Sequence, residues 1–283
     1  MVAAMNVLAI QSAVAFGHVG NEAARLPLNL LGHEVWPIDT VRFSNHPGHG
    51  RFRGRVTPPE EVAALLQGLE ELGLFARVDA VLSGYLGDPR TAALVARTVA
   101  SVKRANPAAR YLCDPVMGDD DRLFVDPAIP ALMRDLLAPL ADVVTPNVFE
   151  LARLAGAAPL DATEHGLRAA ARALERPLVV LTGVASDDTP ADAIDTLAVT
   201  PARAWRVRAP RLARRFDGVG DCFAALLLGR LLNDEPPPRA VARAVSSLQP
   251  ILEATGDARD LALVAARAAI TRPPKTFRAR PLA

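Results

Sequence analysis

Short apolar runs alternate along the chain with longer segments rich in alanine and leucine. Several runs are almost continuously apolar, which is typical of strands in a parallel sheet covered on both faces. The predicted strands are Asn6–Gln11, Glu34–Ile38, Asp79–Ser83, Arg110–Cys113, Asp142–Thr145 and Leu178–Leu181. The segments of helical composition are Asn21–Leu31, Glu60–Leu72, Arg90–Ala105, Ile129–Leu137, Val148–Leu154 and Glu164–Leu174. This order predicts right-handed βαβ units and an α/β fold with a doubly wound, mostly parallel sheet flanked by helices.

The alternation breaks in two places. Thr40–Val56 is polar, rich in glycine and long for a connection, so we expect a small flap over a site. Asp195–Thr200 and Ala204–Arg208 flank a turn that contains proline, which predicts an antiparallel hairpin at the sheet edge. The chain from Val219 to about residue 271 returns to helical composition, with Pro236–Pro238 as a turn between helices. Without a repeat or a linker, we expect a single domain over residues 1–283.

Composition narrows the class of protein. A chain of 283 residues with 51% hydrophobic residues can bury one large core, and a net charge of +1 argues against a broad nucleic-acid surface. The cysteines, Cys113 and Cys222, are far apart and lack a zinc spacing, which favours packing roles in a reducing cytosol. The apolar N-terminal run has no preceding basic segment and the length of a buried strand. We therefore expect a cytoplasmic protein without membrane or nucleic-acid partners.

Polar residues gather where the predicted strands end. Ligands of doubly wound sheets bind beyond the carboxyl ends of the strands, so these residues outline one crevice. Each could instead be a helix cap or turn residue, but the recurrence at successive strands favours the crevice. The residues are Gln11, Ser12, Ser83, Gly84, Tyr85, Asp114, Thr145, Asn147, Thr182 and Gly183.

The segment Asp217-Gly218-Val219-Gly220-Asp221 precedes an apolar helix, Cys222–Leu232. Its glycines allow a tight turn whose amides point at an anion, and the helix dipole strengthens that attraction. Asp221 would lie in the first helical turn, where the dipole keeps a carboxylate ionised. Phosphoryl transfer to an alcohol needs such a base beside such an anion site. The alternative is an ordinary glycine-rich loop with an aspartate at the start of a helix.

Other nucleotide-binding motifs are absent from the sequence. The segment is no dinucleotide fingerprint, because Phe223 stands at the third glycine position. Neither Lys103 nor Lys275 follows a glycine, so the chain has no P-loop. The glycine-loop set of protein kinases is also missing.

Six segments together resemble the pyridoxal/pyridoxamine kinases of the ribokinase-like superfamily. They occur in the order of that family and span residue 6 to about residue 233, and VLSGYLG, SNH and CDPVMGD are the specific ones. DGVGD alone would indicate only the wider superfamily. The segments are VLAIQSAVAFGHVGN, VWPIDTVRFSNHPGHG, VLSGYLGD, CDPVMGD, VTPNVFE and DGVGD.

The resemblance implies roles for individual residues. On the vitamin side, Ser12 would hydrogen-bond the pyridine ring and Asp221 would deprotonate the 5′-hydroxymethyl group, while Gly218, Val219 and Gly220 form the anion hole. The other residues of this pocket would be Val19, His46, Pro47, Gly48 and Tyr85.

On the nucleotide side, the resemblance implies that Asp114 and Glu150 hold magnesium and phosphate, directly or through water. Thr145, Asn147 and Thr182 would lie near the phosphates. The adenosine would lie against Ala209, Pro210, Arg211 and Leu212.

The sequence departs from the family at Pro47, where a threonine usually hydrogen-bonds the substrate. Proline lacks that side-chain contact and a backbone donor, and one neutral hydrogen bond contributes about 1 kcal/mol. The preference among pyridoxal, pyridoxamine and pyridoxine therefore stays open. Arg211, Arg214 and Arg215 could clamp phosphates, but exposed arginines favour solvation instead.

The resemblance implies transfer of the γ-phosphoryl group of ATP to the 5′-hydroxyl of a B6 vitamer. Magnesium would neutralise the polyphosphate, a monovalent cation can assist in this family, and a homodimer is expected. Two alternatives stay open: a kinase for another hydroxymethyl heterocycle, such as hydroxymethylpyrimidine, and a catalytically idle B6-binding protein.

Further ionisable residues favour structural roles. The acidic run Asp119–Asp121 favours a solvated loop, in which only Asp119 matches the family pattern. His18, His46 and His49 lack the spacing of a metal cluster. We expect His33 and His165 at the surface.

Overall fold

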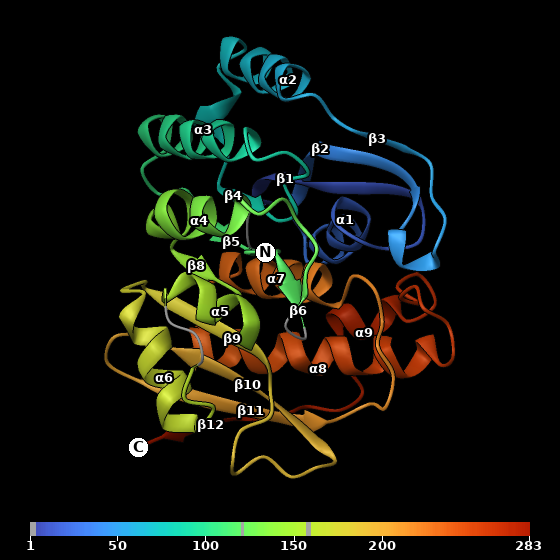
Figure 1. Cartoon of the computed structure of the whole chain (residues 1–283), viewed down its shortest axis with the longest axis vertical. Coiled ribbons are helices and arrows are strands. Elements are labelled where there is room, and N and C mark those ends of the chain that lie inside the picture. The colour runs from blue at the N-terminus through green and yellow to red at the C-terminus, as the bar shows by residue number, and fades with distance from the viewer. Residues whose placement is uncertain (1–3, 120–121, 157–159) are drawn as a thin grey trace.

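A central ten-stranded sheet runs through the part of the chain that the computed structural model describes, residues 4–119, 122–156 and 160–283 (Figure 1). Its order is β12-β11-β10-β9-β8-β5-β4-β1-β2-β3. The strands are β1 (Asn6–Phe16), β2 (Glu34–Asn45), β3 (Gly54–Val56), β4 (Ala80–Ser83), β5 (Arg110–Cys113), β8 (Val143–Val144), β9 (Leu178–Val184), β10 (Ala193–Val199), β11 (Ala204–Pro210) and β12 (Ala279–Leu282). A separate pair is formed by β6 (Gly118–Asp119) and β7 (Arg122–Leu123).

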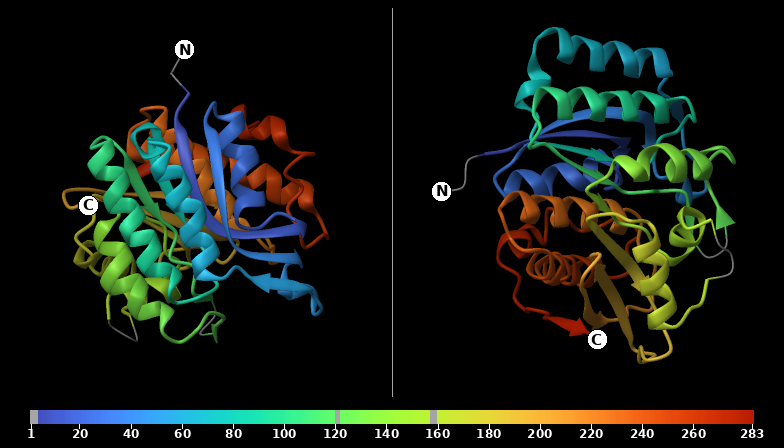
Figure 2. Two further views of the ribbon diagram at one scale, coloured as in Figure 1. Left: turned by 90° about the horizontal axis from the view of Figure 1, so that it is seen from above. Right: turned by 90° about the vertical axis from the view of Figure 1, so that its left-hand side faces the viewer.

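The six strands from β2 to β9 in this order pair in parallel, and the strands at both ends of the sheet are antiparallel. Helices cover both faces (Figures 1 and 2). They are α1 (Asn21–Leu30), α2 (Pro59–Glu71), α3 (Thr91–Ala105), α4 (Ile129–Leu132), α5 (Val148–Leu154), α6 (Glu164–Ala173), α7 (Val219–Leu232), α8 (Pro237–Thr255) and α9 (Arg267–Thr271). The predicted doubly wound, mostly parallel sheet is confirmed.

The sheet divides the core into two main layers. Alternate residues of β1 point to opposite faces, so Val7 and Ala9 join the layer beneath α1, α7 and α8, while Leu8 and Ile10 join the layer beneath α2 and α3. All four side chains are fully buried. Burial on both faces explains why this strand is almost continuously apolar in sequence.

The flap, Thr40–Val56, differs from the expected loop. β1 and β2 continue as paired strands to Phe16 and Asn45, and β3 then pairs back on β2. Between them lies a short 3-10 helix, Pro47–His49. Figure 1 shows these strand ends and β3 as an arm beside α1. The flap is therefore an extension of the sheet edge, and the predicted ends of the first two strands were too early.

The predicted hairpin is confirmed as β10 and β11, but it is not the sheet edge, because β12 pairs on the outer side of β11.

The predicted helix Ile129–Leu137 is α-helical only to Leu132 and continues as a π-helical turn, Met133–Leu137. Pro236 caps α8, and the following prolines occupy its first turn, where no amide donor is needed. Short 3-10 turns occupy Leu74–Arg77 and Ala138–Leu140.

His33 was expected at the surface and is instead buried, since its ring packs between α1 and α7. Its Nε2 lies 2.9 Å from the carbonyl oxygen of Gly229, and burial lowers its pKa. Cys113 and Cys222 are buried and free, as predicted. Among the described residues, no helix is both long and apolar enough to cross a bilayer.

Candidate active site

The loop before α7 requires glycine at its last position, the N-cap of the helix. Gly218 has a φ of 80° and serves as the N-cap of α7, and a Cβ there would lie 1.9 Å from the carbonyl oxygen of His18. The start of α7 is therefore pressed against the backbone of His18 and Val19, in the loop that follows β1. This contact brings the glycine-rich segment to the end of the first strand.

Gly20 connects Ser12 to Asp221. Its φ is 54°, and a Cβ on Gly20 would lie 2.1 Å from the carbonyl oxygen of Ser12 and 2.3 Å from Ser12 Oγ. The backbone amide of Gly20 also hydrogen-bonds the carboxylate of Asp221. The structure thus brings together the serine and the aspartate that the sequence placed on separate elements.

The pKa of Asp221 is raised, mainly by burial, while the Gly20 amide and the charge of His46 oppose that rise. The sequence predicted that the helix dipole would keep this carboxylate readily ionised. Desolvation at the floor of the site outweighs that effect. A raised pKa makes the ionised carboxylate a stronger proton acceptor, which suits a general base.

Asp114 follows β5 and is 4% exposed. Its Oδ1 accepts a 2.8 Å hydrogen bond from Thr145 Oγ1. Its Oδ2 has no hydrogen-bond partner among the described residues and lies 3.8 Å from the position of a Cβ on Gly220. Burial and the charge of Asp221 raise the pKa of Asp114 to about 7. Asp114 and the start of α7 therefore share one electrostatic environment.

Glu150 completes a capping box at the start of α5. Its Oε2 accepts from the amide of Asn147 at 2.9 Å, and Asn147 Oδ1 accepts from the amide of Glu150 at 2.8 Å. Its Oε1 accepts from the amide of Met117 at 3.1 Å. Burial and the charge of Asp114 raise the pKa of Glu150, although the hydrogen bonds from the backbone amides lower it.

The predicted nucleotide side continues along β9 and β11. Asn147 and Thr182 form a parallel β-bridge, so these strand ends lie side by side. Ala209 is buried within the core, whereas Pro210 and Arg211 are exposed, and the Arg211 amide donates to Asp192 at 2.8 Å. Leu212, the last of this stretch, is half-buried.

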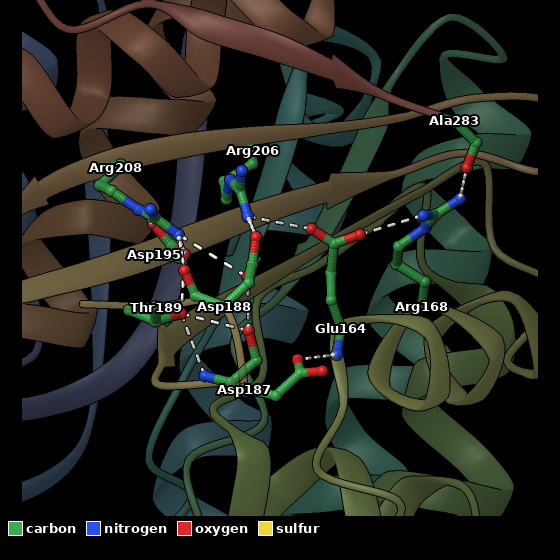
Figure 3. Close-up of polar contacts among 10 residues, drawn as sticks. Glu164, Arg168, Asp187, Asp188, Thr189, Asp195, Arg206, Arg208 and Ala283 are labelled. Atoms are coloured by element: carbon green, nitrogen blue, oxygen red, sulfur yellow. Dashed lines mark hydrogen bonds and ion pairs between the residues drawn. The ribbon is translucent and has the colours of Figure 1, made fainter. Parts of the chain in front are cut away.

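An ion-pair network fixes the hairpin behind that stretch (Figure 3). Asp195 is 1% exposed and accepts two bonds from Arg208, at 2.8 and 2.7 Å, and one from Thr189 Oγ1 at 2.8 Å. Arg206 joins Glu164, at the start of α6, to Asp188. The loop between β9 and β10 is thereby tied to both hairpin strands.

The predicted vitamin-side residues have mixed exposure. Val19 is buried, Tyr85 and His46 are half-buried, and Pro47 and Gly48 are exposed. Tyr85 is held through its backbone, because its carbonyl accepts from the hydroxyl of Thr40 in the flap. His46 Nδ1 lies 2.8 Å from Asp217 Oδ2, so the flap contacts the segment before α7.

Pro47 fits its position without cost to the local backbone. It is the first residue of the 3-10 helix and His46 is its N-cap, a place where the absent amide donor is not needed. The side chain of Pro47 cannot make the hydrogen bond to the substrate that a threonine usually makes in the family that the sequence resembles. The effect of Pro47 on substrate preference therefore stays a prediction about binding, not about folding.

Ser83 was one of the polar residues at the strand ends, but it does not face the crevice. It is fully buried, and its hydroxyl lies 2.7 Å from Tyr111 Oη inside the core. Asp120 and Asp121 of the acidic run lie outside the described residues. Arg214 pairs with the exposed Asp257 at 2.8 Å, which agrees with the solvated alternative.

Comparison with known proteins agrees with this geometry. A family model described as phosphomethylpyrimidine kinase matches residues 56–260. The pyridoxal kinase PdxY of Corynebacterium diphtheriae is 43% identical over 99% of this chain and 100% of its own length, and that of Rubrobacter xylanophilus is 44% identical over 99% and 98%. This chain belongs to the pyridoxal kinase family.

Its fold is accordingly that of the ribokinase-like kinases. A solved pyridoxal kinase from Leishmania donovani, in complex with ADP and pyridoxamine, matches with a TM-score of 0.91 at 31% identity, covering 98% of this chain and 99% of that one. The family assignment confirms the resemblance that the sequence motifs carried.

Sequence reasoning gave no individual role to three residues that lie beside the predicted site residues. Gly20 bridges Ser12 and Asp221, and Asp217 and Arg259 contact the flap. The glycine could have been found from its place in the GHVGN segment. No local sequence signal marks Arg259, because its contact with Asp217 depends on how the loop after α8 folds back onto the segment before α7.

Proposed function

We propose that this protein phosphorylates the 5′-hydroxymethyl group of a vitamin B6 vitamer with ATP, in salvage of the vitamin. The observation that carries the proposal is the meeting of Asp221, the glycine-rich start of α7 and Ser12 at one end of the sheet. The pyridoxal kinase relatives and the Leishmania complex with ADP and pyridoxamine support the substrate class.

Asp221 would accept the proton of the substrate hydroxyl as the hydroxyl oxygen attacks the γ-phosphorus. The amides of Gly218, Val219 and Gly220, together with the positive end of α7, would stabilise the charge on the transferred group. Ser12 would orient the pyridine ring, and Val19, His46, Pro47, Gly48 and Tyr85 would enclose it. Alignment and exclusion of water by the flap supply most of the catalysis in such a site.

The nucleotide would lie on the other half of the crevice. Thr145, Asn147 and Thr182 would contact its phosphates, and Ala209, Pro210, Arg211 and Leu212 would face the adenosine. Buried Ala209 would contribute through its backbone, because its side chain packs into the core.

Asp114 fits a cation, because its Oδ2 is buried without a partner among the described residues and its pKa is raised by burial and by the charge of Asp221. Glu150 fits less directly, since both of its oxygens already accept backbone amides. We therefore propose that Asp114 holds the magnesium directly and that Glu150 acts through water. When bound, magnesium would neutralise the polyphosphate, and a monovalent cation could add to that charge.

Three broader expectations remain proposals. A single domain over residues 1–283 is supported by the continuous sheet, and a homodimer by the family resemblance. A cytoplasmic location is supported by the two free, buried cysteines. Sedimentation at several concentrations would measure the oligomeric state.

A second candidate is a kinase for hydroxymethylpyrimidine, a pyrimidine related to the phosphomethylpyrimidine that the description of the matching family model names. We expect ADP formation with pyridoxal, pyridoxamine or pyridoxine to have a kcat/KM at least about 10-fold above that with hydroxymethylpyrimidine, since pocket contacts of 1–2 kcal/mol discriminate on that scale. The measurement is steady-state ADP release with ATP and magnesium. Higher efficiency with the pyrimidine would transfer the assignment to the second candidate.

Product analysis separates both kinases from a B6-binding protein without activity. The proposal expects the vitamer 5′-phosphate and ADP in equal amounts. Vitamer binding without any phosphorylated product would support the carrier instead.

A further inference from the structure

Charged side chains fasten the tip of the flap to two segments that are distant in sequence. His46 Nδ1 lies 2.8 Å from Asp217 Oδ2, and Arg259 Nε lies 2.5 Å from the same oxygen. Arg259 Nη2 lies 3.2 Å from Asp217 Oδ1, so the guanidinium engages both carboxylate oxygens. A second pair joins His49 Nε2 to Asp260 Oδ2 at 3.0 Å.

Asp217 is the fixed centre of this arrangement. Its side chain is 12% exposed, against 36% for His46 and 47% for Arg259. Its backbone amide donates to the carbonyl oxygen of Arg259 at 3.1 Å, and it forms a β-bridge with Asp260. Burial alone would raise the pKa of Asp217, but the bonds from His46 and Arg259 outweigh burial and lower it. The carboxylate is therefore held ionised in one place.

The contacts of His46 select one tautomer of its ring. Nδ1 lies near both Asp217 Oδ2 and the amide nitrogen of Gly48, the latter at 3.2 Å. A neutral Nδ1 either donates to the carboxylate or accepts from the amide, and cannot do both. The Gly48 amide is oriented as a donor to Nδ1, but the contact with the carboxylate is shorter and would be charge-assisted, which favours a proton on Nδ1. A proton on Nδ1 would leave Nε2 as the acceptor of the neutral ring.

Gly48 allows this arrangement because it lacks a side chain. A Cβ there would lie 2.2 Å from Arg259 Nη2 and 2.8 Å from His46 Nδ1. The guanidinium therefore rests against the flap backbone while it holds Asp217. The flap tip, Asp217 and Arg259 are thus one connected unit.

We propose that Asp217, supported by Arg259, is a positioning residue that fixes His46 with its proton on Nδ1 and holds the flap against the vitamer pocket. The proposal rests on the proposed function for the role of His46 in that pocket. Asp217 itself touches neither reacting group and acts through the histidine. Vitamer binding should therefore depend on Asp217, and nucleotide binding should not.

The tautomer can be measured without any reference to activity. The chain has five histidines, so the ring signals of His46 can be assigned in ¹H–¹⁵N spectra from a His46→Gln variant. At about pH 8.5, well above the ordinary histidine pKa, we expect the proton on Nδ1 in the wild type and a loss of that preference in Asp217→Asn. A wild-type ring protonated on Nε2 alone overturns the proposal.

Kinetics then test the consequence for binding. Asp217→Asn should raise the KM for pyridoxal about fivefold and leave the KM for ATP within about twofold, the scale of a partly exposed charged contact. The matched control is Asp257→Asn, which removes an 88% exposed carboxylate from the loop that carries Arg259 and should change neither value. Equal rises in both KM values, or none, would contradict the positioning role.

A double variant shows whether Asp217 acts through His46. If it does, His46→Gln with Asp217→Asn should bind pyridoxal no more weakly than His46→Gln alone. Additive losses would show that Asp217 acts independently and would overturn the inference. A wild type that turns over no vitamer would reject the proposed function instead. The tautomer measurement would still decide whether Asp217 positions His46.

Discussion

Asp114 combines three features that belong together physically. Its carboxylate is almost fully buried, one oxygen has no partner among the described residues, and the charge of Asp221 acts on it. An isolated carboxylate in this setting is held partly protonated until a cation approaches. These features lower the stability of the folded protein at neutral pH, and they suit the cation role proposed for Asp114.

The raised pKa of Asp114 predicts that the free energy of unfolding depends on pH. The pKa of Asp114 is raised from 3.8 to about 7, so the folded state binds its proton more tightly than the unfolded chain does. The free energy of unfolding should therefore fall as pH rises from about 4 to about 7, by on the order of 3 kcal/mol from this group. Asp114→Asn should flatten that fall.

Urea unfolding at pH 5 and pH 8, with magnesium removed by chelation, measures the effect of Asp114. Asp257→Asn serves as a control, because that carboxylate is exposed and should leave the pH dependence unchanged. A fall of the same size in wild type and Asp114→Asn would contradict the raised pKa.

At the residue scale, the sequence predicts the proposed catalytic residues better than it predicts the contacts of the residues around them. Asp221 and Asp114 stand in short motifs, and both lie where the strand ends predicted. The resemblance implied only a ligand role for Glu150, and the structure adds that its side chain completes the capping box of α5. The pairing of His46 with Asp217, and the burial of His33, could not be predicted, because each depends on contacts between distant elements.

At the scale of elements, the hairpin β10–β11 depends on one buried ion pair. Asp195 is 1% exposed, and Arg208 and Thr189 satisfy both of its oxygens. Asp195→Asn should lower the free energy of unfolding by about 2 kcal/mol, because Arg208 would lose its buried carboxylate partner and keep only the half-exposed Asp188 at 3.7 Å. Urea unfolding of the variant measures the loss.

The matched control is Asp188→Asn, which removes a carboxylate that contacts both arginines of β11, Arg206 and more distantly Arg208, but is 50% exposed. Its loss should stay below about 1 kcal/mol. Equal losses from Asp188→Asn and Asp195→Asn would show that burial does not decide the contribution of these pairs.

The flap shows where prediction of elements stops. Its polar, glycine-rich composition indicated a loop, yet β2 continues through Asp39–Asn45 because it keeps pairing with the extended β1. At the opposite edge of the sheet, β12 could not be predicted either, because a strand at a sheet edge is partly exposed and needs no apolar pattern. Its sequence is Ala-Arg-Pro-Leu. The central strands were predictable because burial on both faces leaves a strong signal.

At the scale of the whole molecule, the parallel core places every proposed catalytic group at one end of the sheet. Strands β9, β8, β5, β4 and β1 are neighbours, so their carboxyl ends form one row beside the start of α7. The fold class followed from this regularity before any coordinates, and the crevice at the strand ends stays a prediction. Substrate preference does not follow from it, because it depends on a few flap contacts such as those of Pro47.

The central claim is that Asp221 is the base for phosphoryl transfer to a B6 vitamer. The most direct test is the turnover of Asp221→Asn with pyridoxal and ATP, alongside ATP binding measured by calorimetry. We expect kcat to fall at least about 100-fold with ATP affinity retained, the usual scale for a positioned base. Near-normal turnover in this variant would contradict the assignment.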